Sequence, residues 1–293
     1  MANTIGWGQA SVNNTIDWGK GKTNNSIGWG NIYSSSPSGE TDISGTPAGD
    51  ADANAFIAAA AITDTTQKAA IDKLVTDLKG YGIWTKMKAL YPFVGGTASS
   101  HKWNLKNPLD TDAAFRLVFN GGATHDSTGI TGNNVNAFAN TFLNDQTTLN
   151  IDSKHIAMYQ RNILTTESGG SMGIGNSNRF YLNSGGSNYS TLGMAQSAFT
   201  IVAPQRGVFV MSKTSAGQFK YFQNALTPVT KLGTNFPQNS VYYLLASSLI
   251  PSAPGVSSAN LSLASIGDGL SDTEVTNYNT AINTFQTTLS RNV

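Results

Sequence analysis

The chain has 293 residues, a formal net charge of +1 and no cysteine, and this length is sufficient to bury a hydrophobic core without disulfides or metals. The near-neutral charge argues against a nucleic-acid partner, which would need a cluster of basic residues, and the absence of cysteine excludes thiolate zinc sites and cysteine catalysis. Charged residues make up 12% of the sequence, about half the usual share. With abundant Asn, Ser, Thr and Gly, this composition favours a mainly β protein.

Two kinds of targeting segment are not expected. The sequence contains no apolar run of about 18 residues, which a membrane-spanning helix would require. It begins MANTIGWGQA, without the basic start and apolar stretch of a signal peptide. We therefore expect neither membrane insertion nor export through such a signal.

Residues 1–33 repeat an Ile-x-Trp-Gly motif with a period of 11 residues. On an extended strand the Ile and Trp of each repeat point to the same face, but isolated short strands are marginally stable in water and need a covering partner. Tryptophan is also enriched in binding hot spots. We therefore predict a docking segment that contacts its partner through Ile5, Trp7, Ile16, Trp18, Ile27 and Trp29. The alternative is that these strands extend the protein's own sheet.

A linker and a helical segment follow the repeat. Residues 34–50 are rich in Ser, Gly and Pro, a composition typical of a flexible or extended connector. Residues 51–92 show helical periodicity: one helix from Asp52 to Ile62, and a second after Asp64 that ends at Gly80. We predict a capping-box pair of Asp64 and Gln67 for the second helix. A third short helix is expected from Ile83 to Leu90.

The remaining residues, 93–293, alternate short apolar segments with Gly- and Asn-rich turns, the pattern of an antiparallel β-sandwich. The expected strands are Ala114–Phe119, His155–Tyr159, Phe180–Leu182, Phe199–Val202, Val208–Met211, Phe219–Phe222, Val241–Leu245 and Leu261–Ile266. Ser215-Ala216-Gly217 is predicted to close a hairpin, because Gly adopts the positive φ that tight turns require.

The sequence predicts a final helix most clearly. Ser271 and Glu274 form a capping box, and Leu270 and Val275 occupy the positions of a hydrophobic staple. An apolar seam then follows at helical spacing, made of Val275, Tyr278, Ile282, Phe285 and Leu289. A seam of this kind packs either on the sandwich or on a symmetry-related copy.

Three parts of the sequence, in this order, resemble virion proteins of tailed bacteriophages. They are the Ile-Gly-Trp-Gly repeats, the stretch Gly82–Phe93 (GIWTKMKALYPF) and the tail Ile266–Asp272 (IGDGLSD). The central and C-terminal parts resemble the laminin-G-like, concanavalin-A-like jelly rolls of phage fibre and appendage proteins.

The resemblance implies a mainly β fold: an antiparallel jelly-roll sandwich with a C-terminal helix, preceded by a short α-helical segment and an extended N-terminal repeat. It also implies a non-enzymatic structural component of the virion, in a head or tail fibre or appendage, that serves in adhesion or host attachment. The expected partners are other virion proteins through residues 1–33, identical chains in a homo-oligomer (a trimer is favoured), and a host surface glycan. The alternative is a lectin or a glycan-degrading enzyme on the same fold.

Candidate site residues are few. Trp103, Tyr181 and Tyr189 lie near Asn residues and are the candidate glycan-binding aromatics; as an alternative, each packs in the core or at an edge. Glycan-hydrolysing enzymes of this fold type carry a Glu-x-Asp-x-Glu strand or a close variant, and the sequence lacks one. We expect no cofactor and no metal, since His101, His125 and His155 are widely spaced. A calcium ion held by Asp110, Asp112 or Asp126 stays an open alternative.

Overall fold

The computed structural model describes residues 49–164, 169–175, 178–181, 188–193, 198–199, 205–235, 238–250 and 253–293. The predicted docking residues and almost all of the predicted linker lie outside these ranges, so their predictions stay untested. No helix in the described part of the chain combines the length and apolar character needed to cross a membrane.

The helical segment begins as the sequence predicts. Helix α1 (Ala51–Ala59) is capped by Asp50, and α2 (Thr65–Gly80) is capped by Asp64, whose carboxylate accepts from the Gln67 backbone N–H at 2.8 Å. The amide oxygen of Gln67 accepts from the Gly95 backbone N–H, so only the Asp64 half of the predicted capping box is observed. Gly80 is the last residue of α2, as predicted.

The third predicted helix is wrong. Residues Trp84–Lys86 form a single 3-10 turn (η1), and Met87–Tyr91 form strand β1, which pairs antiparallel with the strand Asn260–Gly267. Tyr91 shows why: its ring is fully buried between the two sheets, and its hydroxyl donates to the Phe115 carbonyl. The free energy gained by burying the Tyr91 ring in the sheet outweighs the local helical pattern.

Eight of the described strands form an antiparallel sheet, sheet 1, in the order β13-β12-β11-β6-β17-β4-β3, with β1 also beside β17. Their bounds are β1 Met87–Tyr91, β3 Thr124–Asp126, β4 Gly129–Thr131, β6 Lys154–Gln160, β11 Gly207–Ser215, β12 Gln218–Gln223, β13 Val229–Leu232 and β17 Asn260–Gly267. The predicted hairpin is present, since Ala216 and Gly217 connect β11 to β12.

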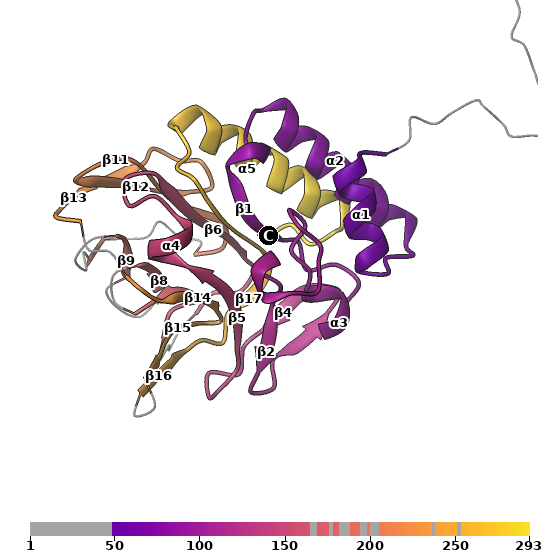
Figure 1. The fold of residues 1–293 in the computed structure, drawn as a ribbon, viewed down its shortest axis with the longest axis horizontal. Coiled ribbons are helices and arrows are strands. Elements are labelled where there is room, and N and C mark those ends of the chain that lie inside the picture. Colours follow the sequence, from indigo (N-terminus) through magenta and orange to yellow (C-terminus); the bar gives the residue numbers. More distant parts are fainter. Residues whose placement is uncertain are drawn as a thin grey trace, which may run out of the picture. The chain divides into compact units, whose positions relative to one another are not determined.

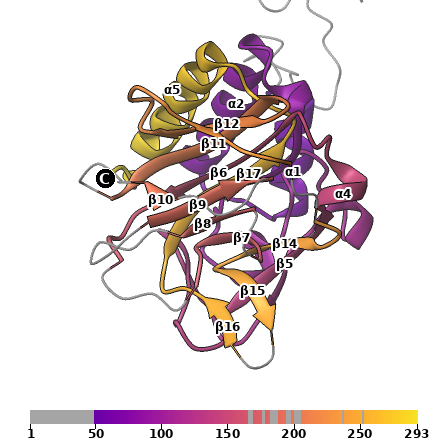
Figure 2. The ribbon, with the colours of Figure 1, turned by 90° about the vertical axis from the view of Figure 1, so that its left-hand side faces the viewer.

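Seven further described strands form sheet 2, in the order β10-β9-β8-β7-β14-β5-β2. Their bounds are β2 Val118–Asn120, β5 Phe138–Asn144, β7 Met172–Ile174, β8 Asn178–Tyr181, β9 Asn188–Leu192, β10 Ala198–Phe199 and β14 Val241–Leu244. The chain crosses repeatedly between the sheets, which gives the predicted jelly-roll sandwich. A separate hairpin, β15 (Ala246–Ile250) and β16 (Ala253–Val256), lies at one end (Figure 2).

Three short elements connect the strands, and one long helix follows them. Helix α3 (Ala98–His101) and the 3-10 turn η2 (Asp112–Ala114) lie between β1 and β2, and α4 (Asp145–Thr148) lies between β5 and β6. Helix α5 (Asp272–Thr288) follows β17, and both reciprocal bonds of its Ser271–Glu274 capping box are present. The sequence therefore predicts the start of α5 correctly.

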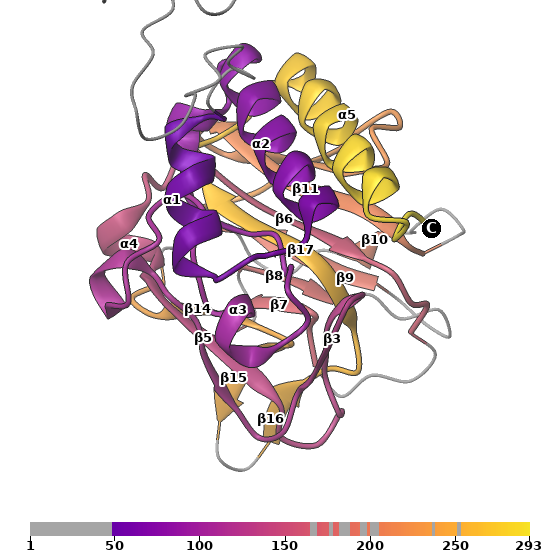
Figure 3. The same ribbon diagram turned by 90° about the vertical axis from the view of Figure 1, so that its right-hand side faces the viewer.

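The described unit has two hydrophobic cores on opposite faces of sheet 1. One fills the space between the sheets and includes Phe180 and Phe209, whose rings meet edge to face. The other lies between the outer face of sheet 1 and helices α1, α2 and α5, where Val275, Tyr278, Ile282 and Phe285 of the predicted seam are buried and Leu289 is half-buried. The seam therefore packs on the sandwich, and Figures 1 and 3 show the three helices over β11, β6 and β17.

Arg291 connects the C-terminal tail to β17 and to the two residues that follow β1. Its side chain is 3% exposed, and its guanidinium donates to the carbonyls of Phe93, Pro92 and Ser262 and to the Gln286 side chain, at 2.7 to 3.3 Å. Burial lowers the pKa of Arg291 to about 9, which still leaves it charged at neutral pH.

We predict that Arg291→Ala lowers the free energy of unfolding by about 3 kcal/mol or more, because several buried carbonyls lose their donor at once. Urea denaturation followed by circular dichroism measures this change. Arg206→Ala is the matched control, since the Arg206 side chain is exposed and its removal should change stability by less than about 0.5 kcal/mol. Equal stability of the two variants would contradict the role given to Arg291.

Candidate functional site

The outer face of sheet 2 is the candidate binding surface. Helices cover the outer face of sheet 1, whereas Ala139, Tyr242, Met172 and Phe180 of sheet 2 point inward into the core between the sheets. Because side chains alternate along a strand, the neighbours of these residues point away from the core. Asn140, Tyr243 and Arg179 are such neighbours, and each is half-buried.

These residues form one continuous line across four strands, which we name the outer row. Asn140 of β5 is the register partner of Tyr243 of β14, Tyr243 is the partner of Gly173 of β7, and Gly173 is the partner of Arg179 of β8. Gly173 has a φ of +150°, and a Cβ there would lie 2.2 Å from the Asn178 carbonyl oxygen. The backbone therefore requires glycine at position 173, between Tyr243 and Arg179.

Aromatic rings gather at one end of the outer row. The Phe138 ring meets Tyr243 edge to face, with centroids 5.8 Å apart, and the Arg116 guanidinium lies 5.9 Å from the ring centroid of Phe142. Phe142 has a positive φ of 56°, and its backbone N–H donates to the Asn140 side chain at 2.8 Å. Burial raises the pKa of Tyr243, so its hydroxyl stays protonated at neutral pH and is able to donate.

The predicted glycan-binding aromatics do not lie together. Tyr181 and Tyr189 are direct register partners on β8 and β9, but their side chains are outside the described part. Trp103 lies between α3 and η2, where it packs against the core beneath the helices and stacks under the Lys102 ammonium at 4.6 Å. The structure therefore pairs the backbones of the two tyrosines and places Trp103 on the helix side of sheet 1.

The fold pairs two histidines that are far apart in the sequence. Nδ1 of His101, at the end of α3, lies 3.1 Å from Nδ1 of His125 on β3. His101 is 1% exposed, and its burial lowers its pKa to about 3; burial also lowers the pKa of His125. At neutral pH both rings are uncharged, so one Nδ1–H donates to the other Nδ1.

No group of three His, Cys, Asp or Glu residues in the described ranges is arranged to hold a metal ion. The aspartates considered for calcium are engaged with protein groups. Asp110 pairs with Lys102 and Arg116, Asp112 pairs with Arg116, and Asp126 accepts from Thr128. His155 is separate from the other histidines and bonds to the Asp268 carbonyl and the Ser265 hydroxyl.

We predict that acid destabilises the protein partly through His101. The pKa of His101 is about 3 in the folded state and 6.5 when the ring is exposed. Its contribution to the free energy of unfolding is therefore complete above pH 6.5 and is lost as the pH falls toward 3. Between pH 6.5 and 5 this amounts to about 2 kcal/mol. His101→Phe should therefore lose less stability than the native chain when urea denaturation at pH 7 and pH 5 is compared.

His125→Asn is the control for this measurement, because it keeps a hydrogen-bonding group beside His101. Its stability should fall with acid nearly as steeply as that of the native chain. An equally steep fall in His101→Phe would show that His101 does not contribute.

A second polar cluster lies between the sheets at one end of the sandwich. Lys154 of β6 and Lys213 of β11 are register partners, and both are 1% exposed or less. The Lys154 ammonium donates to both oxygens of Asp145 at 2.7 and 2.9 Å, and Asp145 also accepts from the Tyr242 hydroxyl at 2.8 Å. Burial lowers the pKa of both lysines.

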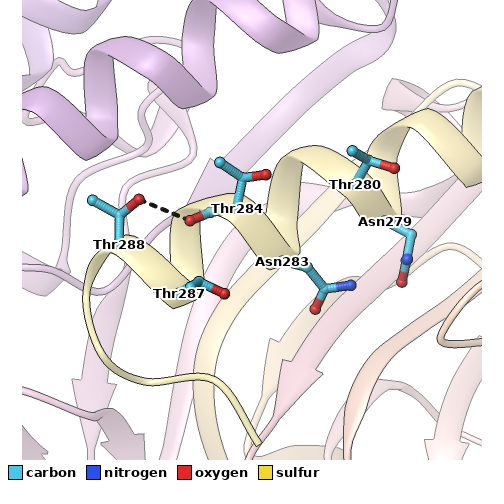
Figure 4. A pocket seen from close by; sticks show the side chains of 6 residues that line it. All are labelled: Asn279, Thr280, Asn283, Thr284, Thr287 and Thr288. Atoms are coloured by element: carbon cyan, nitrogen blue, oxygen red, sulfur yellow. Dashed lines mark hydrogen bonds between the residues drawn. The ribbon is translucent and has the colours of Figure 1, made fainter.

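A shallow groove runs along the exposed side of α5 (Figure 4). Its walls are Asn279, Thr280, Asn283, Thr284, Thr287 and Thr288. The hydroxyls of Thr280 and Thr288 donate back to carbonyls of the preceding turn, at 3.1 and 2.9 Å. These lining residues include no charged or nucleophilic group suited to catalysis.

Comparisons with known proteins give remote similarities only. No family model and no curated protein matches the sequence. Domain 4 of the extracellular GH43 arabinanase AbnA from Geobacillus stearothermophilus is similar over 66% of this chain and 98% of its own, with 15% identity and a TM-score of 0.43.

Two longer proteins show similar scores. A mutant Trypanosoma rangeli sialidase has 11% identity and a TM-score of 0.47 over 73% of this chain. The binding domain of Paraclostridial Mosquitocidal Protein 1 has 9% identity and a TM-score of 0.43 over 66% of this chain. The chain spans 39% of the sialidase and 51% of the toxin domain.

Proposed function

We propose that this chain is a non-enzymatic structural component of a bacteriophage particle that binds a host surface glycan on the outer face of sheet 2. The observation that carries the binding role is the asymmetry of the sandwich. Helices cover one outer face, and the described part of the other carries the half-buried outer row.

The chemistry of the outer row suits a sugar. Glycan sites combine an aromatic ring with a few polar groups that fix orientation, and Tyr243 provides a ring and a protonated hydroxyl between an amide and a guanidinium. Sheet strands hold these groups in fixed register, so little conformational entropy is lost on binding. A row across several strands suits an elongated polysaccharide better than a small molecule.

The place in the particle is proposed from the sequence. The repeat in residues 1–33 has the apolar pattern of strands that need a covering partner. The order of the repeats, the stretch Gly82–Phe93 and the tail Ile266–Asp272 resembles phage virion proteins. We propose that residues 1–33 anchor the chain to other virion proteins, that the chain forms a homo-oligomer, with a trimer favoured, and that the sandwich faces outward.

Tyr243→Ala should lower the affinity for the bound polysaccharide about tenfold or more, because it removes the central ring of the outer row. An array of bacterial surface polysaccharides identifies the ligand with the native chain, and biolayer interferometry compares the variants. Tyr81→Ala is the matched control, since Tyr81 is an exposed tyrosine at the end of α2. Unchanged binding by Tyr243→Ala would exclude the outer row, and cleavage of the polysaccharide by the native chain would favour the enzyme alternative.

Deletion of residues 1–33 should leave a folded body, because both described hydrophobic cores consist of residues from Ala53 onward. The truncated chain should bind the glycan normally but no longer join particles when it replaces the native chain in a phage infection. Particle composition, measured by mass spectrometry of purified virions, tests this. Replacement of Trp7, Trp18 and Trp29 by alanine should have the same effect, and normal incorporation of both variants would contradict the anchoring role.

A further inference from the structure

The polar cluster that contains Lys154 and Lys213 has a second set of close contacts, centred on Lys213. The Lys213 ammonium contacts the side-chain oxygen of Asn235, a residue that follows β13. Oδ1 of Asp152 accepts from the Asn235 amide nitrogen at 2.7 Å and lies 3.4 Å from the Lys213 ammonium. One carboxylate oxygen therefore touches both the amine and the amide nitrogen.

The surroundings favour a reactive amine. The Lys213 side chain is fully buried, and this burial lowers its pKa against the opposing effect of Asp152. Lys154, its register partner, places a second buried cation on the adjacent strand. Loss of the Lys213 proton would relieve the cost of holding two ammonium groups side by side in a low-dielectric interior.

We propose that Lys213 and Asn235 form an intramolecular isopeptide bond, with Asp152 as the proton carrier. Asp152 first takes a proton from the Lys213 ammonium. The free lone pair of Nζ then attacks Cγ of Asn235, and the carbonyl π electrons move to Oδ1. Asp152 delivers its proton to the amide nitrogen, and the Cγ–Nδ2 bond breaks as the carbonyl re-forms. Nζ loses its second proton to the departing ammonia, which leaves as ammonium.

The reaction balances without any other reagent. An ammonium and a primary amide become a secondary amide and a free ammonium ion, so the total charge and the number of hydrogens do not change. No electrons are gained or lost. Asp152 ends as the carboxylate that it was at the start, in the manner of a general acid and base placed within reach of both nitrogens.

The neighbouring lysine serves as an internal comparison. Lys154 is held by both oxygens of the Asp145 carboxylate, and an ionised carboxylate is a poor electrophile with no neutral leaving group. Asn235 instead offers an amide carbon and a leaving ammonia. The geometry therefore points to a single cross-link at Lys213, with Lys154 unmodified.

The bond would fix the edge of the sandwich. Lys213 lies near the end of β11 in sheet 1, and Asn235 lies in the connection from β13 to β14, where the chain passes from sheet 1 to sheet 2. A cross-link here closes the β11–β13 segment into a covalent loop. A surface-attachment protein under mechanical load would be held at the point where its edge strands would otherwise separate.

Intact mass spectrometry of the purified full-length chain tests the proposal directly. The native chain should be lighter than its sequence mass by one ammonia, and digestion should yield a branched peptide that joins Lys213 to Asn235. Lys213→Arg should restore the full sequence mass, which separates the isopeptide from ammonia loss by succinimide formation at an asparagine elsewhere. A native chain at full sequence mass, with Lys213 and Asn235 recovered in unlinked peptides, would overturn the proposal.

Asp152→Ala tests the proton carrier in a chain that should still fold, because the Asp152 side chain is 43% exposed. We expect its mass to equal the mass calculated for the Asp152→Ala sequence without loss of ammonia. Lys213 and Asn235 should be recovered in unlinked peptides. Asp112→Ala, which removes another exposed aspartate, should remain cross-linked. A cross-link that forms fully in Asp152→Ala would overturn the role of Asp152.

Discussion

The structure depends on one constraint: the central strands of sheet 1 are buried on both faces. Every residue of β6 and β17 is buried, so this sheet needs a cover on each side. Sheet 2 covers one face and the helices α1, α2 and α5 cover the other. Because the available helices are used on sheet 1, the described outer face of sheet 2 is left without a helical cover, and this asymmetry sets where a ligand has access.

Buried polar groups complete the architecture at places where the apolar cores end. Arg291 donates to the carbonyls of Pro92 and Phe93, which follow β1, and of Ser262 in β17, and Asp145 accepts from an ammonium and a tyrosine hydroxyl at one end of the sandwich. Such groups are costly to bury unless they are paired, and their partners come from distant parts of the chain. The Asp145 cluster joins the two sheets, because Lys154 belongs to β6 of sheet 1 and Tyr242 belongs to β14 of sheet 2.

The local sequence pattern predicts the observed element where it agrees with the tertiary environment. Helix α5 carries a capping box and an apolar seam, and both appear in the structure as predicted. The local pattern predicted the wrong element for β1, where pairing with β17 overrides a helical spacing of large residues. Strand β5 was missed although Ala139, Thr141 and Leu143 alternate inward, because Asn140 within the strand and Asn144 at its end belong to a residue type that is depleted in strands and typical of turns.

The sequence by itself determined the mainly β class, the N-terminal repeat, the positions of α2 and α5 and the scarcity of charge, since each depends on residues close together in the chain. Only the tertiary structure decided the candidate sites. Asn140, Tyr243 and Arg179 become neighbours through strand register, His101 meets His125 across two elements, and Lys213 meets Asn235 and Asp152 through long-range pairing. The physical reason is that local periodicity specifies which face of an element is apolar, whereas the packing of whole sheets specifies which polar side chains meet.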